Sequence, residues 1–154
     1  MRKPRIYLDT SVISYVDQKD TPDKMVITQE VWKVLQQDRY EIIISSLTFD
    51  ELAEANAKKR VIFAKYLELI TYNRVPITQD QRELTEKYLQ HEVLRERNRD
   101  DLIHIACCVS NSCDYLVSWN FTHMVNIRTI NKVNSVNLLC GVREVKIVPP
   151  PMLL

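Results

Sequence analysis

Three acidic side chains follow elements that a fold would bring to one edge. Asp9 comes directly after a short apolar run, Glu51 lies in the first turn of a helix that follows a second apolar run, and Asp101 lies in the first turn of a later helix. Asn120 follows a further apolar run. Carboxylate oxygens without His or Cys partners select hard cations such as Mg²⁺ or Mn²⁺. Such ions bind phosphate oxygens and activate water, so these residue types predict metal-dependent hydrolysis of a phosphodiester.

Convergence of the three carboxylates would be unfavourable without a cation. Two charges about 4 Å apart, at an effective dielectric near 20, repel by about 4 kcal/mol. A fold normally avoids this repulsion unless an ion neutralises the cluster. We therefore expect Asp9, Glu51 and Asp101 to be the metal ligands.

Each carboxylate also has a structural alternative. Asp9 could simply cap the helix that follows it. Glu51 stands three residues after Thr48, the spacing of a capping box, and Asp101 stands in the same relation to Asn98. Acidic residues near a helix N-terminus are favourable whether or not they bind metal. Taken singly, each of these residues is better explained by structure than by catalysis.

Nearby polar and aromatic residues could extend such a site. His104 stands one turn after Asp101 and could be a general base, but apolar neighbours favour a structural role, as they do for His123. Trp119 could stack a nucleobase, although packing against the last helix is the simpler expectation. Asn120 is more often a turn former.

Strands and helices are expected to alternate along the chain. The order predicts an α/β fold, a three-layer α/β/α sandwich with a mostly parallel central sheet, and Pro76 limits the third strand to an edge. Ligands bind at the carboxyl ends of strands in such sheets. Strands are expected at residues 5–8, 41–45, 75–77, 115–118 and 145–148. Helices are expected to start near residues 22, 48, 78 and 98, to pass through residues 63–70, and to span residues 127–138 before Gly141.

Composition excludes several other enzyme classes. The chain has a single glycine, whereas dinucleotide-binding, P-loop and nucleophile-elbow motifs each need at least two. Its 154 residues predict one domain over residues 1–154. The net charge of +1 neither supports nor excludes nucleic acid binding.

The cysteines and the N-terminus point to an intracellular protein. No two of the four cysteines form a C-x-x-C pair, and we expect reduced thiols in the core of a cytoplasmic protein. The first apolar run, about three residues long, is too short for a signal peptide or a membrane span. The four cysteines are Cys107, Cys108, Cys113 and Cys140.

Four segments resemble the PIN-domain ribonucleases, especially the VapC-like toxins of bacterial and archaeal toxin–antitoxin pairs. Their order along the chain matches the family, and the tail over residues 131–149 looks like one branch of it. The matching segments are residues 6–13 (IYLDTSVI), 45–52 (SSLTFDEL), 99–106 (RDDLIHIA) and 114–123 (DYLVSWNFTH).

The resemblance implies a function and a set of site residues. It implies a Mg²⁺- or Mn²⁺-dependent endoribonuclease with RNA as substrate, an antitoxin protein as possible partner, and a homodimer. Asp9, Glu51 and Asp101 match the family's metal ligands, and Asn120 stands where many members have a fourth acid. Asn120 could ligate through its carbonyl oxygen or orient a water, but without its charge a second ion would be held more weakly.

Two other functions stay open at this point. A PIN-like module that binds RNA or protein without cutting would tolerate Asn120 in place of an acid. A phosphoryl-transfer domain with Asp9 as nucleophile is less favoured, since a haloacid-dehalogenase-like enzyme would need a second Asp where Ser11 stands.

Overall fold

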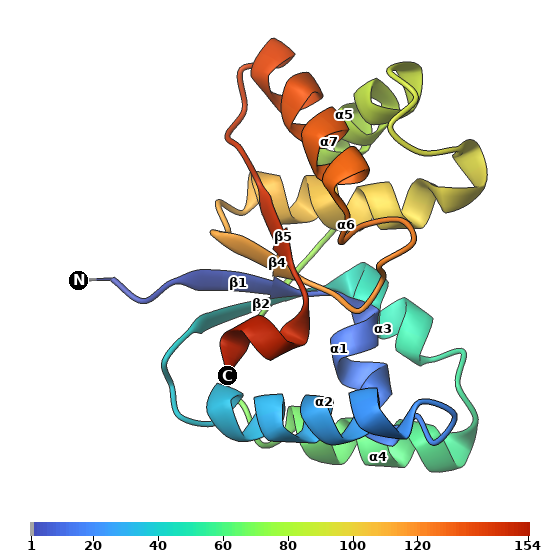
Figure 1. Cartoon of the computed structure of the whole chain (residues 1–154), viewed down its shortest axis with the longest axis vertical. Coiled ribbons are helices and arrows are strands. Elements are labelled where there is room, and N and C mark those ends of the chain that lie inside the picture. Colours follow the sequence, from blue (N-terminus) through green and yellow to red (C-terminus); the bar gives the residue numbers. More distant parts are fainter. Residues whose placement is uncertain (1) are drawn as a thin grey trace.

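The computed structural model describes residues 2–154, in which a parallel sheet is covered by helices on both faces (Figure 1). The strand order is β3-β2-β1-β4-β5, and each neighbouring pair is parallel. This arrangement confirms the expected α/β/α sandwich. The strands are β1 (Arg5–Leu8), β2 (Glu41–Ser45), β3 (Asn73–Val75), β4 (Tyr115–Val117) and β5 (Lys146–Val148).

The helices divide between the two faces of the sheet. In Figure 1, α5, α6 and α7 lie above the strands, whereas α1 to α4 lie below them. The helices are α1 (Thr10–Ser14), α2 (Pro22–Leu35), α3 (Ser46–Leu52), α4 (Ala57–Leu67), α5 (Gln79–Gln90), α6 (Arg99–Ser110) and α7 (Ile127–Leu139). Short 3-10 turns span Tyr15–Asp17, Glu96–Asn98 and Pro150–Leu153.

Each face of the sheet has its own hydrophobic core, because successive strand side chains point to opposite faces. Tyr7 of β1 and Ile43 of β2 pack with α5, α6 and α7. Their neighbours Ile6, Leu8 and Ile42 pack instead with α1, α2 and α4. The buried isoleucines of β2 therefore serve both layers, as an uninterrupted apolar strand in a parallel sheet should.

The sheet has a topological switch point beside β1. The chain moves outward from β1 through β2 to β3, and then returns to add β4 on the other side of β1. The carboxyl ends of β1 and β4, where loops diverge to opposite faces, therefore flank a crevice of the kind that binds ligands in open α/β sheets. Asp9 follows β1 and Ser118 follows β4 at this crevice.

Several local predictions hold. Thr78 forms a capping box with Gln81 at the start of α5. Gly141 follows the end of α7 with φ of 69°, the left-handed conformation that glycine adopts without strain. β3 is an edge strand, although it covers Asn73–Val75 and ends before Pro76 rather than including it.

Other local predictions were wrong. Thr48 does not cap α3; Ser45 does, through its side chain, so α3 begins earlier and Thr48 is buried inside it. Glu51 consequently lies in the last turn of α3 and not in its first turn. Trp119 packs against α2 rather than the last helix, because its indole N–H donates to Thr28. Three cysteines are buried, but Cys140 is exposed at the end of α7.

Within the described part of the chain, no helix combines the length and the apolar character that crossing a bilayer requires.

Candidate active site

The carboxylate of Asp9 is held rigidly at the end of β1. It caps α1, because its Oδ1 accepts hydrogen bonds from the backbone N–H of Ser11 at 3.0 Å and from the Ser11 hydroxyl at 2.6 Å. Its Oδ2 accepts from the hydroxyl of Ser118 at 2.7 Å, which joins it to the end of β4. The capping role expected for Asp9 is therefore present, and it orients the carboxylate at the crevice.

Glu51 is held by a chain of buried polar side chains. Its Oε1 accepts from the hydroxyl of Thr10 at 2.8 Å and from Nε2 of His104 at 2.5 Å. On the other side of the imidazole, Nδ1 lies 2.6 Å from the hydroxyl of Tyr7, which in turn lies 2.7 Å from Ser45 Oγ. His104 is thus structural, as expected, but its structural role is to position a candidate ligand.

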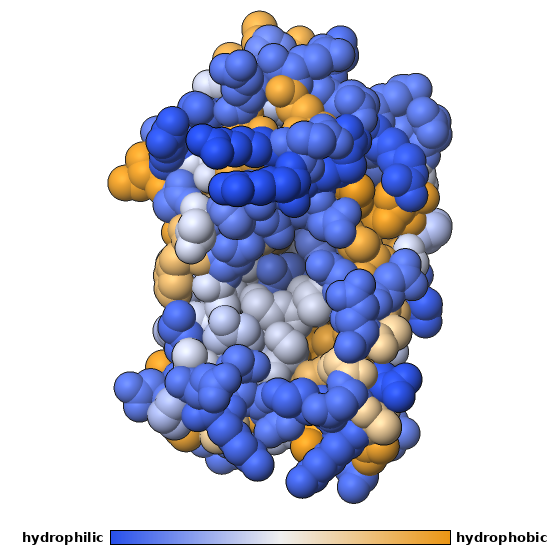
Figure 2. All heavy atoms as spheres, turned by 90° about the vertical axis from the view of Figure 1, so that its right-hand side faces the viewer, coloured by the Kyte–Doolittle hydropathy of each residue, from blue (hydrophilic) through white to orange (hydrophobic). Residues whose placement is uncertain are grey.

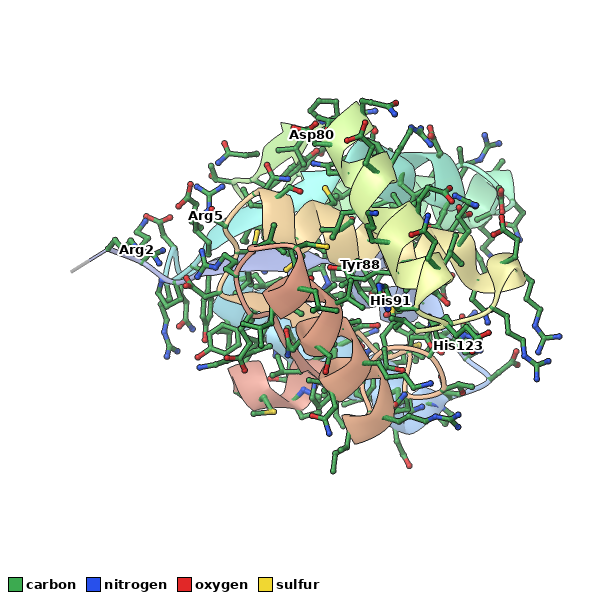
Figure 3. The ribbon with its side chains drawn as sticks, turned by 90° about the horizontal axis from the view of Figure 1, so that it is seen from above. Arg2, Arg5, Asp80, Tyr88, His91 and His123 are labelled. Atoms are coloured by element: carbon green, nitrogen blue, oxygen red, sulfur yellow. The ribbon has the colours of Figure 1, made fainter. Side chains whose placement is uncertain are left out.

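Asp101 lies in the first turn of α6 and pairs with a histidine from another segment. Its Oδ2 is 3.1 Å from Nδ1 of His123. Figure 3 shows His123 at the end of the molecule opposite Arg2 and Arg5, which mark the start of β1. Asn98 precedes α6 but makes no side-chain capping bond, so the capping explanation for this acidic turn is weaker than the sequence suggested.

Asn120 forms the turn that was expected of it. Its Oδ1 accepts from the backbone N–H of His123 at 3.0 Å, while its own N–H donates to the hydroxyl of Ser118 at 2.9 Å. The carbonyl oxygen that could have bound a cation is therefore engaged in holding the loop that carries His123.

One pocket of about 480 Å³ brings these residues together. It opens at the carboxyl ends of the strands, the edge that faces the viewer in Figure 2, where weakly polar, pale atoms gather around and below the centre of a mostly hydrophilic face. Besides the four candidate residues, its lining includes small hydroxyls, His104, one cation and three aromatic rings. Those further residues are Thr10, Ser11, Ser14, Tyr15, Lys24, His104, Trp119, Phe121 and Thr122.

Burial and mutual repulsion disturb the titration of the carboxylates. Burial raises the pKa of Asp9, against the hydrogen bonds that it accepts and the nearby His104. Burial also raises the pKa of Asp101, and the charges of Asp9 and Glu51 raise it further. Partial burial is the largest single influence on Glu51 and raises its pKa, but the hydrogen bond from His104, the charge of His104 and the hydrogen bond from Thr10 together outweigh it, so the net shift is downward.

Burial and the neighbouring carboxylates act in opposite directions on the pKa of His104. Burial lowers its pKa, yet the hydrogen bond to Glu51 and the charges of Glu51, Asp9 and Asp101 together raise it above the ordinary value. Asp9 and Glu51 therefore both act on Asp101, and all three carboxylates act on one imidazole, although they come from segments far apart in the sequence. Clusters of titratable groups that perturb each other in this way are typical of functional sites.

The residues fit a hard divalent cation in donor type, but their present hydrogen bonds do not form a closed cage. Among residues 2–154, no group of three His, Cys, Asp or Glu side chains is arranged to hold an ion. The reason is visible in the contacts: Glu51 turns one oxygen to His104, and Asp101 turns one to His123. Within residues 2–154, Oε2 of Glu51 and Oδ1 of Asp101 accept no protein hydrogen bond, and both residues line the pocket, so each carboxylate keeps one oxygen available for an ion.

The comparisons with known proteins agree with this description. The sequence matches the family model of the PIN domain over residues 6–120, a span that includes every candidate site residue. The fold and the carboxylate-lined crevice thus define an α/β protein of the PIN type, as the sequence motifs implied. The chain belongs to the PIN-domain family.

A solved structure shares the fold across nearly the whole chain. It is the crystal structure of VapBC2 from Rickettsia felis bound to a DNA fragment from their promoter, with a TM-score of 0.57 and 12% sequence identity. The match covers 94% of this chain and 98% of that chain. Among curated proteins, none matches this sequence.

Sequence reasoning missed the partners of the carboxylates. The Tyr7–His104–Glu51 chain joins residues 97 and 53 positions apart, which no local pattern predicts. On the aromatic side of the pocket, Trp119 was expected as a possible stacking residue, but Lys24 and Phe121 beside it were not predicted. A signal was present for Phe121, since an apolar ring directly follows the candidate residue Asn120.

Proposed function

We propose that this chain is an endoribonuclease that hydrolyses RNA phosphodiesters with Mg²⁺ or Mn²⁺. The observation that carries the proposal is the pocket at the switch point, where Asp9, Glu51 and Asp101 line one surface and the charges of the first two raise the pKa of the third. Membership in the PIN-domain family supports it.

The residues of the proposed active site have different roles, as metal ligands or as supports of those ligands. Asp9 and Glu51 would hold the ion from two sides, each fixed by hydroxyl donors, and Asp101 would complete the set from α6. The bound ion would activate the attacking water and stabilise the charge that develops on the phosphate. Ser11 and Thr10 keep the carboxylates oriented, and His104 limits the rotation of Glu51, in the manner of residues that support metal ligands.

Cleavage of a mixed panel of structured and single-stranded RNAs tests the proposal. The native chain, Asp9→Asn and Asp101→Asn are compared with Mg²⁺, with Mn²⁺ and with chelator. Asp100→Asn is the matched control, because Asp100 is an exposed acid in the same turn of α6. We expect metal-dependent cleavage that both site variants lose and the control keeps; cleavage that survives both site variants would show that the site is wrong.

A PIN-like module that binds RNA or protein without cutting is the second candidate. Asn120 favours it, because the position brings no charge and its carbonyl oxygen already accepts from His123. A folded native chain that binds metal and RNA, yet leaves every RNA of the panel intact, would select this function instead.

We also propose a cytoplasmic toxin of a toxin–antitoxin pair that forms a homodimer. The family and the structural likeness to VapBC2 support this role. A toxin should arrest growth when expressed alone, and the arrest should disappear with Asp9→Asn. Light scattering of the purified chain should give twice the monomer mass of 18.2 kDa; a monomer would argue against the dimer.

A further inference from the structure

One wall of the candidate active site is aromatic and cationic, unlike the carboxylate wall. Tyr15 and Trp119 stack with their ring centroids 6.0 Å apart and their planes inclined by 17°. Phe121 packs edge to face on Trp119 at 6.1 Å and 70°. The ammonium of Lys24 lies 5.5 Å from the centre of the Trp119 ring and 5.1 Å from that of Phe121. All four residues line the same pocket as the carboxylates.

Trp119 is the fixed base of this wall. Its side chain is only 5% exposed, its indole N–H donates to Thr28 at 2.9 Å, and its backbone N–H donates to the hydroxyl of Ser11 at 2.9 Å. A ring bound in this way cannot turn toward a ligand. It holds its neighbours in place instead.

Phe121 is the part of the wall that faces outward. Its side chain is 44% exposed, although it has no polar atom to interact with water. The backbone around it is fixed: its N–H donates to the carbonyl of Trp119 at 2.9 Å, and its carbonyl accepts from the side chain of Asn126 at 2.9 Å. A rigidly held, half-exposed ring beside a polar pocket is well suited to stack a flat ligand, with little ordering required on binding.

Lys24 is a cation without an acidic partner. None of the ion pairs found among residues 2–154 involves it. Its ammonium lies over two ring faces instead, the position of a cation–π contact. An anion that entered the pocket would find this cation in its lining.

We propose that this wall is a subsite for one unpaired nucleotide of the RNA, with the base stacked on Phe121 and a phosphate bound by Lys24. The inference rests on the proposed function and adds the residues that hold the substrate beside the carboxylates. Stacking on an aromatic side chain tolerates every base, but a base inside a duplex is already stacked on both faces. The subsite therefore selects single-stranded or looped RNA, with the neighbouring phosphate directed to the carboxylates.

Binding of short oligoribonucleotides in chelator tests the subsite without cleavage. The probe is a fluorescein-labelled single-stranded octanucleotide, together with versions that carry one abasic residue at each position. Phe121→Ala should weaken binding by roughly 5- to 150-fold, the range for loss of one stacked base. Phe121→Leu, which keeps apolar volume but no ring face, should weaken it nearly as much, and Leu138→Ala, on an exposed leucine of α7, is the control.

The abasic probes identify the stacked base by a double-mutant cycle. One abasic position should weaken binding to the native chain as much as Phe121→Ala does, and should cause no further loss in that variant. Lys24→Gln should weaken binding to all sequences alike and reduce the slope of log affinity against log salt by about 1. Undiminished binding by both Phe121 variants, or an abasic effect that persists in full without the ring, would overturn the subsite.

The outcome also separates the subsite from the nuclease proposal. If the chain binds RNA in a manner that depends on Phe121 but never cleaves it, the subsite proposal stands and the nuclease proposal fails. Metal-dependent cleavage with equal rates on single-stranded and duplex RNA, unchanged by Phe121→Leu, would retain the nuclease and reject the subsite. A Phe121 variant that loses affinity for a partner protein but keeps its affinity for RNA would assign the wall to protein docking and overturn the inference.

Discussion

The substitution Asp9→Asn should separate folding from metal binding at the candidate active site. Asparagine has the shape of aspartate, so its Oδ1 can still accept both hydrogen bonds from Ser11. Its amide faces Ser118, whose hydroxyl oxygen accepts from Asn120 and has capacity to accept again. The hydroxyl hydrogen of Ser118 can then turn to the sulfur of Met124 at 3.7 Å.

The stability of the variant follows from these contacts. At most one hydrogen bond is lost, which is a loss of about 0.5–1.5 kcal/mol. Removal of a charge that burial disfavours, which is why the pKa of Asp9 is raised, acts in the other direction. In chelator, the unfolding free energy of Asp9→Asn should therefore lie within about 1 kcal/mol of that of the native chain.

Added metal should distinguish the two proteins. An ion at about 100 times its Kd stabilises the folded state by roughly 2.7 kcal/mol. For a domain of this size, that free energy corresponds to a rise in Tm of roughly 5–11 °C. The native chain should show this rise, and Asp9→Asn should lose most of it because one of three charged ligands is gone.

Scanning calorimetry with chelator, Mg²⁺ and Mn²⁺ measures both effects. Asp100→Asn controls for the loss of one negative charge near the site, and it should keep the full rise in Tm. A full metal-induced rise in Asp9→Asn would place the ion elsewhere and refute the assignment. If the Tm of the native chain responds to neither ion, the proposal that these carboxylates bind a divalent metal fails.

Three further perturbations test the structure away from the ion. Tyr88→Phe should lower the unfolding free energy by about 1–3 kcal/mol, because the buried Oδ1 of Asn137 loses its donor; urea unfolding measures the loss, and a change under 0.5 kcal/mol would contradict the contact. The backbone N–H of Arg5 holds the pKa of Asp114 below its usual value, so the native chain should be more stable than Asp114→Asn at neutral pH. Protonation of that carboxylate removes the advantage as the pH falls below about 4, and urea midpoints that stay apart at pH 2 would refute this cause. Gly141→Ala should lower stability by about 1 kcal/mol in urea unfolding, since only the φ of 69° opposes the methyl group; a more stable variant would contradict the left-handed cap.

Local chemistry explains why much of the fold could be predicted from the sequence. The three isoleucines of β2 have no alternation, which indicates burial on both faces, and both cores contain them. The capping box at Thr78 and the glycine after α7 depend only on residues within one turn. Elements whose boundaries depend on neighbouring residues are therefore predictable.

Other features of the fold and the site could not be predicted, because they depend on contacts between residues far apart in the sequence. Thr48 and Ser45 are both good capping residues and both are buried, but β2 ends at Ser45, so that Ser45 becomes the cap of α3. The indole N–H of Trp119 donates to the hydroxyl of Thr28, which lies 91 residues away in the sequence. Asp9 could be proposed because it directly follows a strand, and Asp101 because it lies in the first turn of a helix. The partners of the candidate ligands, His104 and His123, depend on how distant segments pack together.

The hydrogen bond between Asp9 and Ser118 affects the stage of protein synthesis at which the candidate active site can form. The two residues are separated by 109 positions, and β1 is paired with β4 across the same interval. A growing chain that ends before β4 lacks this support for Asp9 and the whole wall formed by Trp119 and Phe121. Non-local pairing of this kind forms late in folding. Asp9 is translated early, but the residues that orient its carboxylate are complete only after about three quarters of this sequence has been translated. The site of the proposed nuclease would therefore be incomplete in a nascent chain that ends before β4.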